Sequence, residues 1–384
     1  MRRTSRGRSG GIGGGEGVVT VLGQRALNRA LLERQLLLQR GKLSIPAAIE
    51  HLVGLQAQAP NPPYVGLWTR LEGIRLDALT RLMEDRRVVR SALMRGTLHL
   101  VTARDFLKLR PVLQPVLERL HNGAYGRRFE GLDAHEVAAV GRELLEEQPR
   151  TSAELGKLLR ARWPGRDAAV LASAVRNLQP LIHVPPAGTW DSHKPAALIP
   201  AESWLGRALE PASSLDSLIK RYLAAFGPAT VQDVQTWSGL VGARDAMERL
   251  RPRLRTFRDE HGQELFDVPD AALPDPDTEV APRFLPEFDN VLLSYADRSR
   301  ILSEEARARV FTKNGLVRST ILVDGFVRGI WRIHRDRDIA TLHIQPFERL
   351  SKQTRSALND EGARLLDFAA SDAERHDVRF DPLE

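Results

Sequence analysis

Apolar residues in the first hundred positions recur at helical spacing and then change to runs typical of strands. The spacing predicts helices at 21–40, 46–56 and 76–85. Two runs rich in apolar and β-branched residues, 88–94 and 97–101, follow with Arg95 and Gly96 between them, and they predict a β-hairpin. Helices followed by a hairpin form the order of a winged helix-turn-helix unit.

The same order of helices and then a hairpin is predicted twice more along the chain. The second set comprises helices at 137–147, 152–162 and 168–178, a strand at 181–184 and a strand near Trp190. The third set comprises helices at 215–225, 231–240 and 243–250 and strands at 254–258 and 264–268. We therefore predict an α+β fold that contains three tandem winged helix-turn-helix units.

The last hundred residues have the pattern of a β-rich subdomain. A linker rich in proline and acidic residues, 270–282, precedes it. Residues 319–347 alternate as a small antiparallel sheet with a tight turn at Asp324-Gly325, and a helix is predicted at 354–370. The predicted division is a tail (1–17), a first unit (18–102), a connecting helix with a second unit (103–205), a third unit (206–282) and a C-terminal β-rich subdomain (283–384).

Composition narrows the classes of protein to which the chain can belong. Hydrophobic residues make up 42% of the 384 positions, and because no run of about 18 uncharged apolar residues occurs we expect no membrane span. The absence of cysteine excludes disulfides, thiolate metal ligands and cysteine nucleophiles, and it suits the cytoplasm. Residues 1–17, mainly arginine, serine and glycine, are expected to be a disordered basic tail.

The net charge of +7 favours a polyanionic partner, and nucleic acid is the first candidate. Candidate DNA-binding side chains surround the first predicted hairpin and lead into the third: Arg86, Arg87, Arg90, Arg95, His99, Arg251, Arg253 and Arg255. In a strand the last three arginines would share one face and form a track for phosphates. A solvated arginine face accounts equally well for any single arginine, and a lone histidine in an apolar strand also fits a structural role.

Two glutamines separated by one residue, Gln56 and Gln58, lie where the second predicted helix runs into a proline-rich turn. On an ideal helix their side chains would point about 200° apart. Pro60 pushes Ala59 out of the α region, so we expect the helix to end near Gln56 and the chain to leave it extended. Residues i and i+2 of an extended chain lie on one side, which lets the two amides converge. The alternative is an ordinary polar helix end.

Other patterns that could carry chemistry do not form a site. No two histidines stand at metal-ligand spacing with a carboxylate partner, so we predict neither a metal nor a cofactor. Glu287 and Asp289 are either acids near a site or caps of the element that follows them, and capping is favoured.

Five short segments occur in the same order as in one known family: 50–58, 64–68, 95–101, 285–290 and 323–325. Outside the tail, the chain resembles the AlkZ/YcaQ family of winged-helix DNA glycosylases. The resemblance implies tandem winged helices around a cleft for duplex DNA. It also implies excision of alkylated purines, chiefly N7-alkylguanine, including bulky adducts and interstrand crosslinks. The family's Gln-x-Gln or Gln-x-Asp catalytic motif falls on Gln56 and Gln58, in the form that looks like the AlkZ branch.

The resemblance gives the paired amides a chemical role. An N7-alkylated guanine is cationic and is therefore already a good leaving group. We expect the amide carbonyls to orient a water at the anomeric carbon and to soften the developing oxocarbenium charge. No lysine lies near the motif, which favours a monofunctional enzyme that leaves an abasic site. A monomeric, cytoplasmic and nucleoid-associated protein of DNA repair, or of self-resistance to DNA-alkylating antibiotics, fits this interpretation.

Two noncatalytic interpretations stay open. A winged-helix transcriptional regulator would read a sequence in undamaged DNA. An interaction scaffold built from winged helices would bind DNA weakly and with little dependence on salt.

Overall fold

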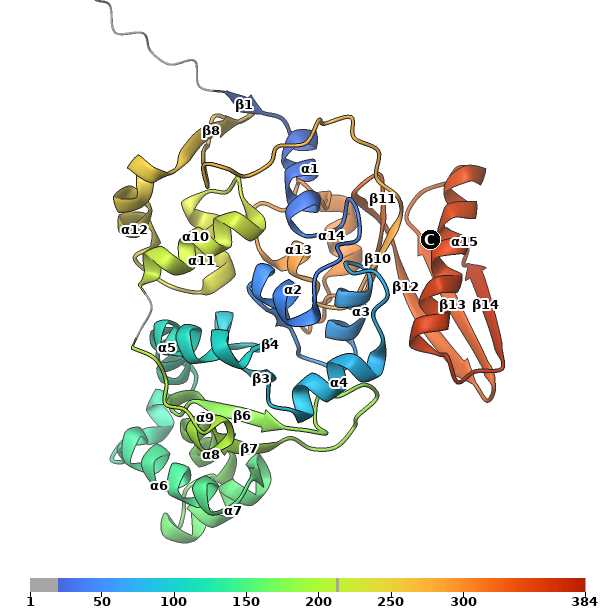
Figure 1. The fold of residues 1–384 in the computed structure, drawn as a ribbon. Coiled ribbons are helices and arrows are strands. Elements are labelled where there is room, and N and C mark those ends of the chain that lie inside the picture. The colour runs from blue at the N-terminus through green and yellow to red at the C-terminus, as the bar shows by residue number, and fades with distance from the viewer. Residues whose placement is uncertain (1–19, 212–213, 384) are drawn as a thin grey trace, which may run out of the picture.

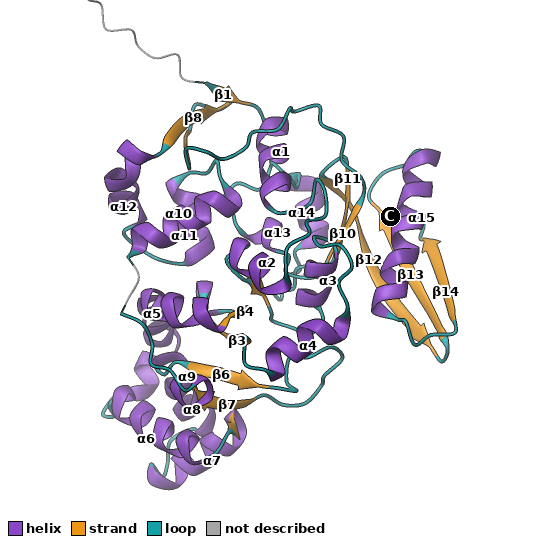
Figure 2. Ribbon diagram, in the orientation of Figure 1, coloured by secondary structure: helices purple, strands orange, loops and turns teal. Residues whose placement is uncertain are grey.

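The computed structural model describes residues 20–211 and 214–383, and the tail predicted at 1–17 lies outside the described residues. Over the described residues the chain forms a mixed α/β fold of helices and four small sheets (Figures 1 and 2). Three of the sheets have three strands each, and the fourth has five.

The segment that carries the two glutamines begins with a short helix and ends as a hairpin. Its elements are α2 (Ile45–His51), β2 (Leu55–Gln56), α3 (Pro62–Trp68), α4 (Leu76–Glu84), β3 (Val88–Ala92) and β4 (Leu98–Thr102). β4 lies between β2 and β3 and is antiparallel to both. The helix predicted at 46–56 is too long, because Val53 and Gly54 turn the chain with φ of 56° and 93°. A Cβ at Gly54 would lie 2.7 Å from Val101 Cγ1, so only glycine fits this turn.

A long helix, α5 (Ala103–Tyr125), leads into a second segment of the same order. Its elements are α6 (Ala134–Glu147), β5 (Arg150–Thr151), α7 (Ser152–Arg162), α8 (Ala168–Leu178), β6 (Leu181–Val184), β7 (Ala197–Pro200) and α9 (Ala201–Leu205). β7 lies between β5 and β6 and is antiparallel to both. The strand predicted near Trp190 therefore begins later, at Ala197. Pro185 ends β6 and Pro195 precedes β7, since proline cannot donate to a strand ladder.

In its described residues, the third segment has no first strand of its own and uses a single bridge instead. Its elements are α10 (Leu215–Phe226), α11 (Val231–Ser238), α12 (Ala243–Leu250), β8 (Arg255–Asp259) and β9 (Glu264–Asp267). The bridge joins Ala229 to Phe266 of β9. In all three segments, an extended stretch between the first two helices pairs with the second strand of the hairpin.

The N-terminal residues join the third segment's sheet, which differs from the predicted division of the chain. β1 (Val21–Leu22) runs parallel to β8 along its edge, and α1 (Gln24–Arg34) follows. The helix predicted at 21–40 is shorter at both ends. It ends before Leu36, whose φ of 56° is left-handed and incompatible with a continuing helix.

The C-terminal part is a five-stranded sheet with a helix packed on it (Figure 2). Its elements are β10 (Arg283–Leu285), α13 (Asn290–Leu293), α14 (Glu304–Val310), β11 (Thr320–Val323), β12 (Phe326–Asp336), β13 (Ile339–Pro346), α15 (Lys352–Ala369) and β14 (Arg375–Phe380). The strands follow chain order, and neighbours are antiparallel except for β13 and β14. Leu358 and Leu365 of α15 pack with Leu342 and Ile344 of β13.

One apolar core joins most of these segments. It includes Leu31 of α1, Val89 of β3, Leu113 of α5, Tyr222 of α10 and Leu322 of β11. The segments therefore share buried surface, although smaller clusters also occur, such as that of Val137, Leu155 and Leu171 within the second segment. Among the described helices, none combines the length and the apolar character needed to cross a membrane.

Candidate active site

Gln56 lies at the end of strand β2 and not at a helix end. It pairs with His99 of β4 across the antiparallel ladder, so the two side chains lie on one face of the sheet. Only 7% of the Gln56 surface is exposed. The Ala57 N–H donates to the Leu98 carbonyl at 2.7 Å and continues the pairing by one residue. The ladder therefore holds the backbone of the glutamine motif in a single register.

Arg95, in the turn between β3 and β4, holds the Gln56 side chain. Its Nη2 donates to Gln56 Oε1 at 2.7 Å, and its Nη1 donates to the carbonyl of Trp237 in α11 at 2.5 Å. Arg95 and Gly96 have φ of 56° and 71°, a left-handed pair that closes the hairpin. Burial and the nearby Arg298 lower the pKa of Arg95 to about 10, so its guanidinium stays cationic at neutral pH.

The free ends of both glutamine amides are their NH2 groups. The exposed Gln58 accepts a hydrogen bond at Oε1 from the Leu98 N–H at 3.3 Å. Guanidinium and backbone N–H groups can only donate, so the atom that faces them in each glutamine is the carbonyl oxygen. Within the described part of the chain, neither NH2 group donates a hydrogen bond. This differs from the expectation that both carbonyls face the substrate, because each carbonyl already accepts a bond from the protein.

Arg90 of β3 supports the backbone of the same motif. Its Nε donates to the Ala57 carbonyl at 2.8 Å, and its Nη2 donates to the Gln58 carbonyl at 3.2 Å. Its Nη1 lies 3.3 Å from Nδ1 of His183 in β6, which joins the motif to the second segment. Arg90 is buried, and burial lowers its pKa to about 10. Its guanidinium is directed at the motif and away from solvent.

His99 is a core residue on the same sheet face as Gln56. It is 2% exposed, and its Nδ1 lies 3.0 Å from the Thr97 carbonyl. Burial, together with the charge of Arg95, lowers the pKa of His99 to about 3, so the ring is neutral at pH 7. A buried neutral ring does not suit a phosphate contact. Its position fits the structural role that the sequence left open.

Arg86 and Arg87 follow helix α4 and differ in their surroundings. Arg86 donates to the Trp204 carbonyl at 2.9 Å, and its guanidinium stacks 4.2 Å from the centre of the Trp204 ring. It therefore joins the first segment to α9. Arg87 is exposed and forms no ion pair with any described residue.

The predicted phosphate track of Arg251, Arg253 and Arg255 is wrong in its geometry. Arg251 and Arg253 lie in a 3₁₀ turn, and only Arg255 lies on β8, so the three do not share a strand face. Arg251 forms ion pairs with Glu248 at 2.6 Å and with Glu264 at 2.7 Å. Arg253 remains exposed.

A cavity of about 550 Å³ opens beside the residues that follow the motif. Ala59, Pro60 and Asn61 form one part of its lining, and Trp190 and Asp191 of the β6–β7 loop form another. Asn61 Nδ2 donates to Asp191 Oδ1, and the Asp191 N–H donates to Asn61 Oδ1, both at 2.8 Å. This reciprocal pair fixes the loop of the second segment to the turn after Gln58.

The C-terminal part supplies the remaining lining of this cavity through Glu287 and Trp331. Sequence reasoning missed the cavity because Asn61 and Asp191 are 130 residues apart in the chain. The signals available were Glu287, which was already a candidate acid, and the tryptophans, which were assigned only to strands. Asp289 does cap α13, by accepting from the Val291 N–H at 3.1 Å, as predicted. Glu287 caps nothing in the described chain.

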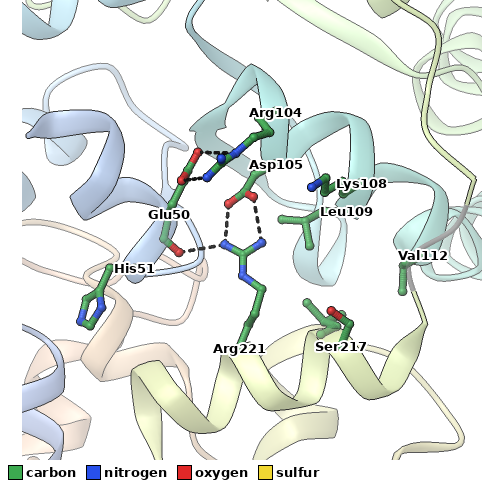
Figure 3. Close-up of a pocket in the computed structure, with 10 residues that line it drawn as sticks. Glu50, His51, Arg104, Asp105, Lys108, Leu109, Val112, Ser217 and Arg221 are labelled. Atoms are coloured by element: carbon green, nitrogen blue, oxygen red, sulfur yellow. Dashed lines mark hydrogen bonds and ion pairs between the residues drawn. The ribbon is translucent and has the colours of Figure 1, made fainter.

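A second cavity, of about 490 Å³, lies between α2, α5 and α10, and four of its charged side chains form ion pairs with one another (Figure 3). Arg221 of α10 donates to Asp105 Oδ1 at 2.9 Å and to the Glu50 carbonyl at 2.8 Å. Arg104 forms an ion pair with the Glu50 carboxylate. This network joins the helices. No group of three or more histidine, aspartate or glutamate side chains among the described residues could hold a metal ion.

Comparisons with known proteins define first the fold and then the family. The Streptomyces sahachiroi DNA glycosylase AlkZ has a similar structure, with a TM-score of 0.75 at 22% identity over 94% of this chain and 100% of that one. The "Interstrand DNA cross-link repair glycosylase" of Streptomyces sahachiroi is 26% identical over an alignment 383 positions long, and this alignment covers 91% of this chain and 96% of that protein. A family model for the AlkZ-like DNA glycosylases matches residues 49–368. The chain belongs to this AlkZ-like family of DNA glycosylases.

Proposed function

We propose that this protein is a monofunctional DNA glycosylase that hydrolyses the N-glycosidic bond of N7-alkylated purines in duplex DNA. Its substrates would include bulky adducts and interstrand crosslinks, since a relative is named for crosslink repair. The three repeated segments would act as winged-helix units that hold the duplex. Of the predicted DNA-binding arginines, the exposed Arg87 and Arg253 are the best placed to contact phosphates.

The observation that carries the proposal is the fixed orientation of the Gln-x-Gln pair. A glutamine anchored by Arg95 and by a β-ladder keeps one conformation, which is the preorganisation that positioning catalysis needs. The residues directly after the motif, from Ala59 on, also line a cavity to which the second segment and the C-terminal part contribute. A mere polar helix end would need none of these supports.

The NH2 groups are the ends that we assign to the substrate. They would donate to the water or to the lesion, while the second lone pair of each carbonyl oxygen stays available to accept. Because the cationic base leaves readily, positioning suffices and a strong general base is unnecessary. The residues that hold the pair include no lysine, which agrees with hydrolysis to an abasic site without strand cleavage.

Base release under single-turnover conditions tests this function. We expect the wild type to release N7-methylguanine from a duplex, and Gln56→Ala and Gln58→Ala each to slow release by about a hundredfold, as for the loss of one preorganised donor. Gln56→Glu retains an acceptor for Arg95 but has no NH2 group, and we expect it to be as slow as Gln56→Ala. Full activity of Gln56→Glu would reverse our assignment of the amide ends.

The same assay separates the glycosylase from a winged-helix regulator. A regulator would protect a specific sequence of undamaged DNA and would release no base. Release of base from a nitrogen-mustard crosslink in a parallel reaction would extend the substrate range to interstrand lesions. Gel filtration with and without DNA would test whether one chain is sufficient for binding.

A further inference from the structure

We propose that the 550 Å³ cavity beside the glutamine motif is a subsite for the positively charged purine ring of an N7-alkylated monoadduct, with Glu287 as the residue that recognises its charge. The inference rests on the proposed glycosylase function, and it states how the enzyme would distinguish the cationic lesion from neutral guanine. It concerns binding, whereas Gln56 and Gln58 concern the chemical step.

The lining of the cavity has the chemistry that a planar cation requires. Trp190 and Trp331 both line it, and aromatic rings attract cations through the ring quadrupole. Trp331 is held in place by its Nε1–H, which donates to the Leu285 carbonyl at 2.9 Å. Trp190 packs edge-on against Tyr64, with ring centres 5.5 Å apart. Both aromatic walls are therefore fixed before a ligand arrives.

Glu287 is an unpaired acid at the point where this cavity meets a neighbouring one of about 400 Å³. Among the described residues, no arginine, lysine or histidine lies within 4.0 Å of its carboxylate. The nearby acid Asp289 is by contrast bound at both oxygens by Arg70, at 2.7 and 2.9 Å. Partial burial without a compensating cation raises the pKa of Glu287. An incoming cation would supply the missing charge.

The two arginines that line the cavity do not pair with Glu287. Arg335 pairs with Asp372 at 2.7 Å, and Arg332 contacts Asp381 at 3.4 Å. Both are thus turned to carboxylates of the C-terminal part. In the described chain, Glu287 is therefore left without a paired cation although two arginines line the same cavity.

A position of Glu287 next to the leaving base predicts that its removal affects binding and the rate of base release differently. As the glycosidic bond breaks, positive charge leaves the purine and appears on the sugar. A carboxylate that touches the purine therefore stabilises the bound substrate at least as much as the transition state. Removing it should weaken binding without slowing the bound complex.

The experiment compares two duplexes whose lesions resist hydrolysis. One carries N7-methylguanine on 2′-fluoroarabinose and is cationic, and the other carries 7-methyl-7-deazaguanine, which has the same shape but is neutral. We expect the wild type to bind the cationic duplex about tenfold more tightly. Glu287→Gln should bring the two affinities within about twofold of each other, whereas Glu279→Gln, at an exposed carboxylate outside the cavity, should retain the difference.

Release of N7-methylguanine at saturating enzyme is measured in parallel. For Glu287→Gln we expect a rate constant equal to or above that of the wild type. A wild type that releases base but shows no charge preference, or a Glu287→Gln variant that keeps it, would overturn the subsite while leaving the glycosylase function intact. A wild type with the charge preference but no base release would support the subsite and refute the glycosylase.

Discussion

At the scale of single residues, the site depends on arginines that act within the protein. Arg90 and Arg95 were predicted to contact DNA, but both donate hydrogen bonds to the glutamine motif. Arg90 donates to the backbone of the motif, and Arg95 donates to the Gln56 amide. An arginine can bridge two carbonyl groups because its donors form a rigid fork. The sequence therefore indicated that these arginines matter to the site, but it did not indicate which groups they bind.

The role of Arg95 can be tested by a change that retains its charge. Arg95→Lys has one donor nitrogen in place of the two that bond Gln56 and the Trp237 carbonyl, so it loses the rigid fork, and we expect the single-turnover rate of base release to fall about tenfold or more. Affinity for undamaged duplex, and its dependence on salt, should remain as in the wild type. If Arg95 binds phosphate instead, replacing it with alanine would lower the slope of log K against log salt by about one, and the rate at saturation would not change.

At the scale of elements, periodicity predicted the amphipathic helices well. α7, α8 and α12 have the predicted bounds. One face of α7 and of α12 is buried and the other is solvated, whereas α8 is buried throughout from Val170 to Val175 and is marked by the Asp167 cap at its start. No helix was predicted at α3, since every residue from Pro62 to Trp68 is buried and no polar face marks a helix. β1 is two residues long and depends on β8 for its pairing.

The site could be predicted only in part, because sequence patterns report contacts between neighbouring residues and not contacts between distant ones. Gln56 and Gln58 stand two apart in sequence, and their motif could be recognised by that spacing. The hydrogen bond from Arg95 crosses 39 positions, and no local pattern reports it. The extended path of Gln56 was expected, yet the turn that produces it is made by Gly54 and not by Pro60. Tertiary packing decided these features.

The turn that carries Arg95 makes a prediction at the element scale. Gly96 has φ of 71°, and a Cβ there would lie 2.5 Å from Leu120 Cδ1. Gly73 has φ of 63° with no heavy atom within 4 Å of the same position. We expect Gly73→Ala to lower the free energy of unfolding by about 1 kcal/mol from backbone strain alone. Gly96→Ala also meets Leu120 Cδ1, the free end of a side chain that is 45% exposed, so it should lose at most about 1 kcal/mol more.

Urea unfolding and base release should be measured on both glycine variants. Gly96→Ala should also slow base release, because Arg95 shifts with the turn, while Gly73→Ala should not. Equal losses of stability in the two variants would mean that the Leu120 contact relaxes freely. Equal rates of base release would mean that the turn does not position Arg95.

At the scale of the whole molecule, ion pairs join the first seventy residues to the C-terminal third. The pairs are Arg25–Asp324, Arg29–Asp324, Arg34–Asp267, Arg40–Glu361 and Arg70–Asp289. The basic composition therefore overstates the free positive surface, since many arginines are neutralised inside the fold. DNA binding depends on those that remain exposed, and counting arginines in the sequence could not distinguish the two groups.

The Arg70–Asp289 pair provides the sharpest test of this long-range coupling. Arg70 and Asp289 are 0% and 1% exposed and join α3's C-terminal end to the segment that carries Glu287. Asp289→Asn retains the shape of the side chain but leaves a buried guanidinium without its counter-charge. We expect the free energy of unfolding to fall by about 3–5 kcal/mol.

Neutralising both partners should recover much of that loss. Arg70→Met combined with Asp289→Asn removes the buried charge. The amide oxygen introduced by the second substitution can still accept from the Val291 N–H. The double variant should therefore be more stable than Asp289→Asn alone. Asp77→Asn breaks the exposed contacts with Arg75 and Arg81 and should leave the urea midpoint unchanged. If Asp289→Asn and the double variant unfold at the same midpoint, the cost does not come from the unpaired charge. If Asp289→Asn instead separates unfolding into two transitions, this pair is what makes the N-terminal and C-terminal parts unfold together.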